Sequence, residues 1–374
     1  MKKAAVFLAM AIGALSCSPG GNYVKDRFEA TTPEGISTAV AHRGCWLMEP
    51  DGEYYIPENS IDAVRMAARY GYPAVEIDVK YTLDLKMVAM HDGTINRTMR
   101  NAADYSKIEK PVRVDAMMFE DLRKNYVLES SDPDMRRPIP TLEEILKACK
   151  QTGVVPMLHS KILESYELAQ KILGNRWIAF EENIYALKYA RGLSDCLVLW
   201  DPGKTEAEKT VEGLREIGGW TGMSTMNYNM QDSLYIAKIH QGGCITQSSI
   251  FPTPWEQRAL KGNTDIQLSD FFWFQTNKRD PVYTINESTS LKAGETWQSA
   301  VVPVSVFSAI TIELEFKGEI ELEVNDRAPR VYPLARSTKG IERAGIRLYK
   351  VSPGFEIRAV NDTDVNIKAS IYEL

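Results

Sequence analysis

The sequence predicts an α/β protein in which an eight-stranded (β/α)8 barrel is followed by a small all-β, sandwich-like domain. Between residues 37 and 280, short apolar strands alternate with helical stretches, the order that builds a parallel sheet covered by helices. From residue 281 to residue 374, apolar and polar residues alternate instead, as in half-buried antiparallel strands. A chain of 374 residues has room for both domains. The second domain would bind a glycan or a partner, or brace the barrel.

The first 17 residues are typical of an export signal. Lys2 and Lys3 precede an apolar run from Ala4 to Leu15, which is too short to span a bilayer. The residues that end at Cys17 resemble the cleavage box of bacterial lipoproteins. We therefore expect an exported, periplasmic or outer-membrane-associated lipoprotein with a lipid anchor on Cys17 and a linker over residues 18–36. The alternative is a secretory signal that is cut nearby without lipidation.

The charge balance argues against nucleic acid as a partner. The sequence holds 44 basic and 50 acidic residues, a formal net charge of -6, and no long run of basic residues that would follow a phosphate backbone. The four cysteines after Cys17 show no CxxC spacing, so free, buried thiols are expected there rather than a metal site.

A polar cluster, His42-Arg43-Gly44, follows the first predicted strand, Ser37 to Ala41. Barrel enzymes place their chemistry at the carboxyl ends of the strands, so His42 is a candidate acid or base. The next helix is amphipathic and is expected to end at Gly71. Glu58 comes just before this helix and is therefore expected to be held rigidly, close to the strand ends.

The second predicted strand, Ala74 to Val79, carries two carboxylates. Side chains two residues apart along a strand point the same way, so Glu76 and Asp78 share a face. Two carboxylates that are buried side by side repel each other. A bound cation is their natural companion.

A hairpin is predicted after the second strand. Only Leu83 to Lys86 separate it from the next apolar run, Met87 to Met90, whereas a parallel return needs about a dozen residues or more. The returning arm would bring His91 back beside Asp78. The alternative for a lone histidine is a hydrogen-bonded core residue. Residues 93–137 are less regular and predict an insertion over one face of the barrel.

The third predicted strand, Val154 to Leu158, ends in His159-Ser160-Lys161. His159 and Lys161 share a face, so an additional metal ligand and a cation reach the same site. The helix ahead of this strand begins with a capping box made by Thr141 and Glu144. Strands four to eight are predicted at Trp177 to Phe180, Cys196 to Trp200, Trp220 to Met226, Gly243 to Gln247 and Asp265 to Leu268.

Several motifs resemble those of the glycerophosphodiester phosphodiesterase family. They are Ala41-His42-Arg43-Gly44, Pro57-Glu58-Asn59-Ser60, Glu76-x-Asp78, His91-Asp92 with Asn96-Arg97-Thr98, and Ile139 to Glu144. The resemblance extends over roughly Ser37 to Asp270, with Thr264-Asp265 to Ser269-Asp270 similar to the family's closing strand. It implies a TIM barrel like that of phosphatidylinositol phospholipases. It also implies a divalent metal, commonly calcium or magnesium, and hydrolysis of phosphodiesters.

The resemblance also implies roles for single residues. Glu76 and Asp78 match the family's metal carboxylates, and His42 and His91 match its general base and acid, in an order that the sequence leaves open. Arg43 matches a phosphate contact, and Lys161 matches the family's phosphate-binding lysine. Attack on a phosphodiester needs this combination of proton transfer and charge neutralisation.

The sequence departs from the family pattern in two places. His159 stands where the family has a third metal carboxylate, which makes the site softer and better suited to zinc, manganese or iron than to calcium. Gln247-Ser248 stands near the strand end where family members carry a tryptophan beside the glycerol pocket. The sequence therefore leaves two alternatives for the alcohol part of the substrate, glycerol or another alcohol.

Three functions are compatible with these observations. The first is a metal-dependent phosphodiesterase that hydrolyses glycerophosphodiesters, or a related phosphodiester-linked head group or glycan, in the cell envelope. The second is a binding protein with the same fold and an impaired metal site. The third is a lyase variant that releases a cyclic phosphate. Metal-dependent turnover separates the first from the second, and the first phosphorus-containing product identifies the third.

Overall fold

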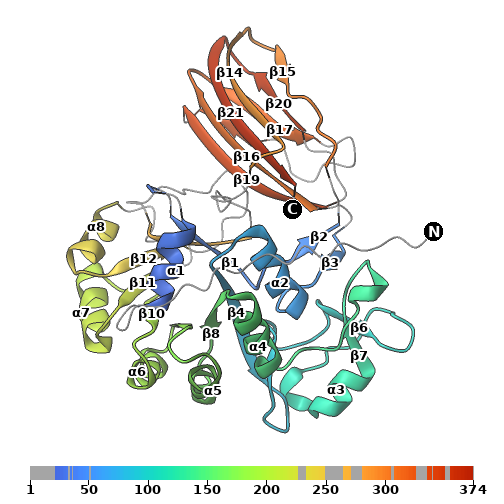
Figure 1. The fold of residues 1–374 in the computed structure, drawn as a ribbon, viewed down its shortest axis with the longest axis vertical. Coiled ribbons are helices and arrows are strands. Elements are labelled where there is room, and N and C mark those ends of the chain that lie inside the picture. The colour runs from blue at the N-terminus through green and yellow to red at the C-terminus, as the bar shows by residue number, and fades with distance from the viewer. Residues whose placement is uncertain are drawn as a thin grey trace.

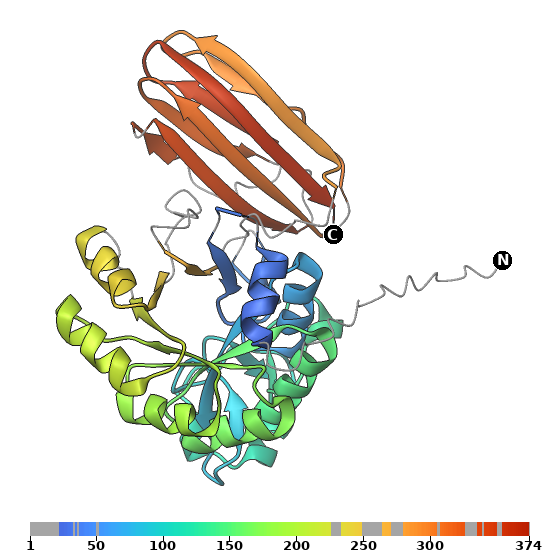
Figure 2. The same ribbon diagram turned by 60° about the vertical axis from the view of Figure 1, so that its left-hand side comes forward.

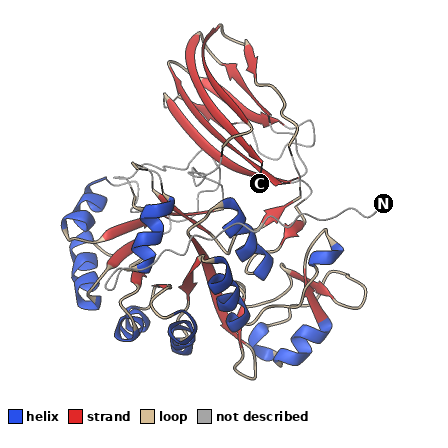
Figure 3. Ribbon diagram, viewed as in Figure 1, coloured by secondary structure: helices blue, strands red, loops and turns tan. Residues whose placement is uncertain are grey.

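The computed structural model describes residues 22–32, 34–35, 37–49, 52–225, 233–248, 264–270, 280–304, 307–325, 335–338, 340–349 and 354–373. The predicted export signal lies outside these residues. A helix-covered barrel forms the lower part of the molecule in Figure 1, and an all-β unit stands above it. In Figure 3, which draws helices blue and strands red, the described upper part shows only strands and loops, whereas the lower part shows helices around its strands.

Eight parallel strands close into a barrel, as predicted. Each strand pairs with the next, and β1 pairs with both β4 and β13, which closes the ring. All eight predicted strands are confirmed. They are β1 (Thr38–Ala41), β4 (Ala74–Tyr81), β8 (Val155–His159), β9 (Ile178–Glu181), β10 (Leu197–Trp200), β11 (Thr221–Thr225), β12 (Ile245–Ser248) and β13 (Ile266–Ser269).

The helices that follow the strands form the outer layer of the barrel. They are α2 (Ile61–Tyr70), α4 (Leu142–Thr152), α5 (Leu163–Leu173), α6 (Ile184–Leu193), α7 (Ala207–Ile217) and α8 (Ser233–Gln241). Gly71 ends α2 in the left-handed conformation, with φ 83°, which a residue without Cβ adopts at little cost. The capping box of Thr141 and Glu144 is present at the start of α4. No helix in the described part of the chain has both the length and the apolarity needed to cross a bilayer.

The helix α1 (Tyr23–Thr31) corrects the predicted linker over residues 18–36. Asn22 caps its first turn, and Val24 and Phe28 pack against residues of the barrel interior such as Val40. These two apolar side chains, four residues apart on one helical face, close the barrel at the amino ends of its strands. With only two buried positions in nine residues, the pattern was too short to predict this helix.

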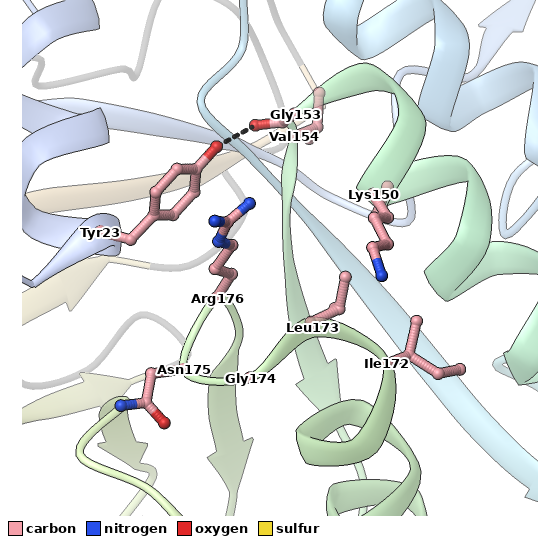
Figure 4. A pocket seen from close by; sticks show the side chains of 10 residues that line it. Tyr23, Lys150, Gly153, Val154, Ile172, Leu173, Gly174, Asn175 and Arg176 are labelled. Carbon is pink, nitrogen blue, oxygen red and sulfur yellow. Dashed lines mark hydrogen bonds between the residues drawn. The ribbon is translucent and has the colours of Figure 1, made fainter. Parts of the chain in front are cut away.

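A cavity of about 400 Å³ lies at the same end of the barrel (Figure 4). The Tyr23 hydroxyl donates a hydrogen bond to the carbonyl of Gly153, at a distance of 3.4 Å, and the Arg176 guanidinium stacks on the Tyr23 ring. Lys150 lies in the last turn of α4, where a cation complements the exposed helix carbonyls. The basic residues of this cavity therefore have a structural explanation.

The predicted hairpin is formed by β4 and β5 (Met87–Ala89), which pair in antiparallel fashion. The segment that follows contains β6 (Met99–Asn101), α3 (Phe119–Asn125), β7 (Tyr126–Leu128) and two short 3-10 helices. It has an apolar cluster of its own, built around residues such as Ile95 and Leu122. A short pair, β2 (Leu47–Met48) and β3 (Tyr54–Ile56), precedes α2.

The C-terminal part consists of two four-stranded antiparallel sheets that share one apolar cluster. One sheet has the order β14-β21-β16-β19 and the other the order β15-β20-β17-β18. The strands are β14 (Tyr283–Leu291), β15 (Thr296–Gln298), β16 (Phe307–Phe316), β17 (Ile320–Asn325), β18 (Ala335–Ser337), β19 (Ile341–Tyr349), β20 (Gly354–Ala359) and β21 (Thr363–Glu373). This architecture agrees with the predicted sandwich.

The sandwich packs directly on the barrel, as Figure 2 shows from a second side. Ala309 and Tyr372 are buried in the apolar cluster that surrounds the barrel strands. The Tyr70 hydroxyl at the end of α2 donates a hydrogen bond to the carbonyl of Ser308, at 3.1 Å. The two parts are therefore joined by buried apolar and polar contacts.

Candidate active site

Three predicted metal ligands meet at the carboxyl ends of β4 and β8. The strands place Asp78 opposite His159 in register. The His159 Nδ1 atom lies 3.2 Å from Asp78 Oδ1 and 3.4 Å from Glu76 Oε1. One ligand atom of each of the three residues falls within 4.8 Å of the other two. The structure thus brings together the three residues that the sequence singled out, including the one from the third strand, and their role as metal ligands stays a prediction.

The three residues fit a divalent metal. Glu76 and Asp78 are almost completely buried, and two carboxylates in that position need a cation nearby. Two carboxylates and an imidazole suit zinc, manganese or iron better than calcium. Burial of His159 opposes protonation, but hydrogen bonds to Asp78 and Glu76 outweigh it and raise the pKa of the imidazole to about 10. A metal ion would therefore compete with a proton for this site.

Asn59 holds the Asp78 carboxylate and was not among the predicted site residues. Its side-chain amide donates to Asp78 Oδ2 at 2.9 Å, and its Oδ1 accepts from the Asp78 backbone N–H at 3.0 Å. The Asn59 backbone has φ 51°, a conformation that costs free energy and concentrates at functional sites. Asn59 belongs to the Pro57-Glu58-Asn59-Ser60 motif, which was the only signal for this role in the sequence.

Arg43 connects two of the predicted metal ligands, Glu76 and Asp78, to Glu58. Its backbone, with φ 53°, turns so that the N–H donates to Glu76 Oε2 at 2.8 Å. The guanidinium lies 3.2 Å from Glu58 Oε1 and 3.7 Å from Asp78 Oδ2. Arg43 therefore lies beside the predicted metal ligands, and its contact with a phosphate stays a prediction.

Glu58 is a buried anchor for two arginines. It accepts hydrogen bonds from Arg43, from both terminal nitrogens of Arg97 and from the Tyr54 hydroxyl. Burial would raise its pKa, but the bonds and charges of Arg97 and Arg43 outweigh burial and lower it. The supporting position predicted for Glu58, at a helix start beside the strand ends, agrees with this geometry.

His42 forms a tight pair with Asp270, the residue that follows β13. The His42 Nδ1 atom lies 2.7 Å from Asp270 Oδ1, and the Trp46 indole N–H donates to the same oxygen at 3.2 Å. Burial opposes protonation of His42, but the hydrogen bond and charge of Asp270, with the charge of Glu76, raise its pKa above the ordinary value. The sequence singled out Asp270 only as part of a motif at the closing strand.

His91 forms a second pair with its neighbour Asp92, at 2.7 Å between Nδ1 and Oδ1. Asp92 in turn accepts from the Arg97 guanidinium, which links this pair to Glu58. The Met90 backbone N–H donates to the Asp78 carbonyl at 3.1 Å. The hairpin therefore returns the chain to the predicted metal ligands. The prediction that the hairpin places His91 near Asp78 is confirmed, and Arg97 is an additional partner.

A cavity of about 560 Å³ opens onto this cluster. Its lining includes Asp78, His91, His159 and Lys161. Lys161 is exposed, and among the described residues it has no ion-pair partner within 4.0 Å. An available ammonium group beside the predicted metal ligands is suited to an anionic substrate. Its role in phosphate binding stays a prediction.

Gln247 occupies the position of the second departure from the family pattern. It is completely buried on β12 and donates to the Ser224 hydroxyl at 2.9 Å. Its side-chain oxygen has no hydrogen-bond partner among the described residues. Residues 249–263, which follow this strand, lie outside the described residues, so both alternatives for the alcohol part of the substrate stay predictions.

Comparisons with known proteins identify a family and agree with the fold. A sequence model of the Glycerophosphoryl diester phosphodiesterase family matches residues 42–239. Glycerophosphodiester phosphodiesterase 1 of Mus musculus is 35% identical over 122 residues, which are 31% of this chain and 31% of the mouse protein. A putative glycerophosphodiester phosphodiesterase of Bacillus subtilis (strain 168) is 31% identical over 109 residues, 29% of this chain and 38% of that protein. The matched segments thus span about a third of these curated relatives.

Solved structures give the same fold. A putative glycerophosphodiester phosphodiesterase from Galdieria sulphuraria has a TM-score of 0.50 at 17% identity, covering 66% of this chain and 98% of that one. A putative glycerophosphoryl diester phosphodiesterase from Silicibacter pomeroyi DSS-3 also has a TM-score of 0.50, at 15% identity, covering 68% and 96%. At these identities the likeness is one of fold.

Proposed function

The chain belongs to the glycerophosphoryl diester phosphodiesterase family, and we propose from this premise that it is a metal-dependent phosphodiesterase. Its proposed substrates are glycerophosphodiesters or a related phosphodiester-linked head group or glycan of the cell envelope. The observation that carries the proposal is the Glu76, Asp78 and His159 cluster beside the cavity that His91 and Lys161 also line. A site of this kind combines metal ligands, an imidazole and a free cation.

Hydrolysis of a phosphodiester requires one proton taken from water and one given to the leaving alkoxide. His42 is suited to give the proton, because Asp270 favours its charged form. His91, whose Nδ1 is engaged by Asp92 and whose side chain is 41% exposed, is suited to take the proton from water through Nε2. The carboxylate partner fixes the orientation of each ring.

Positive charge is needed at the two oxygens of the phosphate that are not in the reacting bonds. Lys161 supplies an ammonium group at the cavity wall, and Arg43 is the predicted second contact. A divalent ion held by Glu76, Asp78 and His159 would, when bound, neutralise the same oxygens as a Lewis acid. Family resemblance favours calcium or magnesium, and the imidazole of His159 favours zinc or manganese.

The envelope location rests on the N-terminal sequence. The apolar run from Ala4 to Leu15 and the lipoprotein-like residues up to Cys17 support export and a lipid anchor. The chain would then act as a periplasmic or outer-membrane-associated lipoprotein. Mass spectrometry of the protein made in a bacterial host tests this, because a lipidated chain starts at Cys17 and carries the mass of its acyl groups.

The activity is tested with an aryl phosphodiester and a panel of glycerophosphodiesters, after removal of metal and addition of calcium, magnesium, manganese or zinc. We expect turnover only with added metal. Failure of every metal to support turnover would favour a binding protein instead. Phosphorus NMR distinguishes hydrolysis from the lyase reaction, because the lyase releases a cyclic phosphate first.

A further inference from the structure

One buried arginine of the sandwich reaches the barrel beside the His42 and Asp270 pair. Arg347 lies on β19, the edge strand of its sheet, and is only 4% exposed. It is in register with Ala309, which is in turn in register with Tyr372. Paired residues in neighbouring strands point to the same face. Ala309 and Tyr372 pack into the apolar cluster around the barrel, so Arg347 projects toward the barrel with them.

The guanidinium of Arg347 donates to three separate segments of the barrel. Its Nε lies 3.1 Å from the Tyr72 hydroxyl, its Nη1 lies 3.3 Å from the Trp46 carbonyl, and its Nη2 lies 3.1 Å from the Ser269 carbonyl. The group also lies over the Tyr72 ring, at 5.1 Å from the ring centre. The planar fork of an arginine can hold three acceptors in fixed directions, and a lysine ammonium cannot reproduce this arrangement.

Two of these acceptors belong to the residues that hold the His42 and Asp270 pair. The Ser269 carbonyl also accepts the backbone N–H of His42 at 3.1 Å, and Ser269 immediately precedes Asp270. Trp46, whose carbonyl Arg347 binds, donates its indole N–H to the Asp270 carboxylate. The same guanidinium thus binds two backbone carbonyls beside the pair, that of Ser269 and that of Trp46, whose indole holds the Asp270 carboxylate.

We propose that Arg347 is a positioning residue for the His42 and Asp270 pair, so that the C-terminal sandwich completes the active site of the barrel. This inference rests on the proposed function for its catalytic consequence. Arg347 does not contact the reacting atoms. It orients Asp270, and Asp270 orients the imidazole that donates the proton.

The test compares Arg347→Met and Arg347→Lys with a matched control, Arg343→Met. Arg343 lies on the same strand, and its guanidinium pairs with Glu313 of the neighbouring strand β16, within the sandwich. We expect the Arg347 variants to lose about ten- to a hundredfold in kcat, as misplaced catalytic groups do, with little change in KM. The control should keep both constants. The Lys variant keeps the positive charge but lacks the planar guanidinium. A lower kcat in this variant therefore identifies the geometry of the guanidinium, rather than its charge, as the cause.

A readout that does not depend on turnover is the imidazole N–H proton of His42 in proton NMR. A proton held between Nδ1 and a carboxylate resonates at low field, and Asp270→Asn identifies the signal by abolishing it. We expect the signal to shift or broaden in both Arg347 variants and to stay unchanged in the control. This measurement remains decisive if the protein hydrolyses no phosphodiester, because it reports the pair directly.

A double-mutant cycle separates positioning from a general loss of packing. With Asp270→Asn already in place, Arg347→Lys should cost no further activity, since the pair it positions is gone. Equal losses in both backgrounds would overturn the proposal, and so would a wild-type His42 signal in a folded Arg347 variant. If Arg347→Met fails to fold, the Lys variant alone carries the same test. An unaltered His42 signal together with an unaltered kcat in the Lys variant would refute the proposal.

Discussion

Asp78 and His159 face each other in register across two parallel strands, with 3.2 Å between the Asp78 carboxylate and the His159 imidazole. The geometry of the predicted metal site is therefore set by the pairing of β4 with β8 rather than by a flexible loop. Two further histidine and carboxylate pairs, His42 with Asp270 and His91 with Asp92, belong to the same candidate active site.

Replacing His159 with Glu should shift the metal preference toward calcium. The change supplies a third carboxylate in place of the imidazole, and calcium prefers oxygen ligands. Calorimetric titration of the metal-free protein with calcium and with zinc measures the preference directly. Unchanged affinities for both ions would show that His159 is not a ligand.

Replacing His42 or His91 with Ala should lower kcat by about a hundredfold or more, the usual contribution of a general acid or base. His240→Ala is the matched control. His240 also pairs with a carboxylate, Asp265, at 2.8 Å, but it lies on α8 at the outside of the barrel. Steady-state kinetics of the three variants, measured with the same added metal ion, test this prediction. Wild-type rates for either active-site variant would remove that residue from the mechanism.

Asp270→Asn should move the alkaline limb of the pH–rate profile to lower pH. Burial lowers the pKa of His42 and the Asp270 carboxylate raises it, with a net increase in the native protein. A proton donor with a raised pKa stays protonated to higher pH, so loss of the carboxylate makes activity fall earlier as pH rises. The charges of Glu76 and Arg43 also act on the pKa of His42, but both remain in the variant. They therefore do not contribute to the change in pKa between the two proteins. A profile that keeps its alkaline limb would contradict the assignment of His42 as the proton donor.

Asn59→Gly should weaken metal binding by about ten- to a hundredfold, the range found when partners of metal ligands are removed. Glycine tolerates the positive φ of this position, so the change isolates the loss of the amide that holds Asp78. Ligand-competition measurements of metal affinity test this. Comparison with Asn96→Gly, which removes an amide bonded to backbone carbonyls in the insertion, controls for general destabilisation.

Phe28→Ala should lower the free energy of unfolding by about 3 kcal/mol, the cost of removing a buried aromatic side chain. Phe28 packs into the barrel interior from α1 and contacts the Trp220 ring edge-on at 6.5 Å between centroids. Glu29→Ala on the same helix is exposed and serves as the control. Denaturant unfolding of the two variants gives the difference. Equal stabilities would mean that α1 does not support the closed barrel.

The sequence was sufficient to predict the barrel strands and the proximity of Glu76, Asp78 and His159, because both follow from the pattern of residues along each strand. The alternation around Glu76 and Asp78 fixes which side chains share a face, and the short connection before Met87 permits only a hairpin. Asp270 and Arg347 could not be found in this way. Each acts on His42 from a distant part of the chain. The spacing and periodicity of residues near His42 do not indicate which distant residues will lie beside the end of the first strand.

The α1 helix was missed for a related reason. Val24 and Phe28 form an apolar face only two residues long, and it becomes recognisable only when the open end of the barrel is there to receive it. Asn59 was visible in its motif, but its purpose depends on a left-handed backbone conformation that the residue type alone does not specify.

The His42 and Asp270 pair joins the first and the last strand of the barrel, which are 228 residues apart. We expect contacts between such distant residues to form late in folding, because the entropy of closing the intervening chain must be overcome first. A chain that is still emerging from the ribosome would therefore contain Glu76 and Asp78 but no Asp270 to orient the His42 imidazole. The same holds for a folding intermediate in which helices have formed but the barrel is still open. During refolding, the return of catalysis would mark the moment of ring closure, separately from the earlier recovery of helix signal.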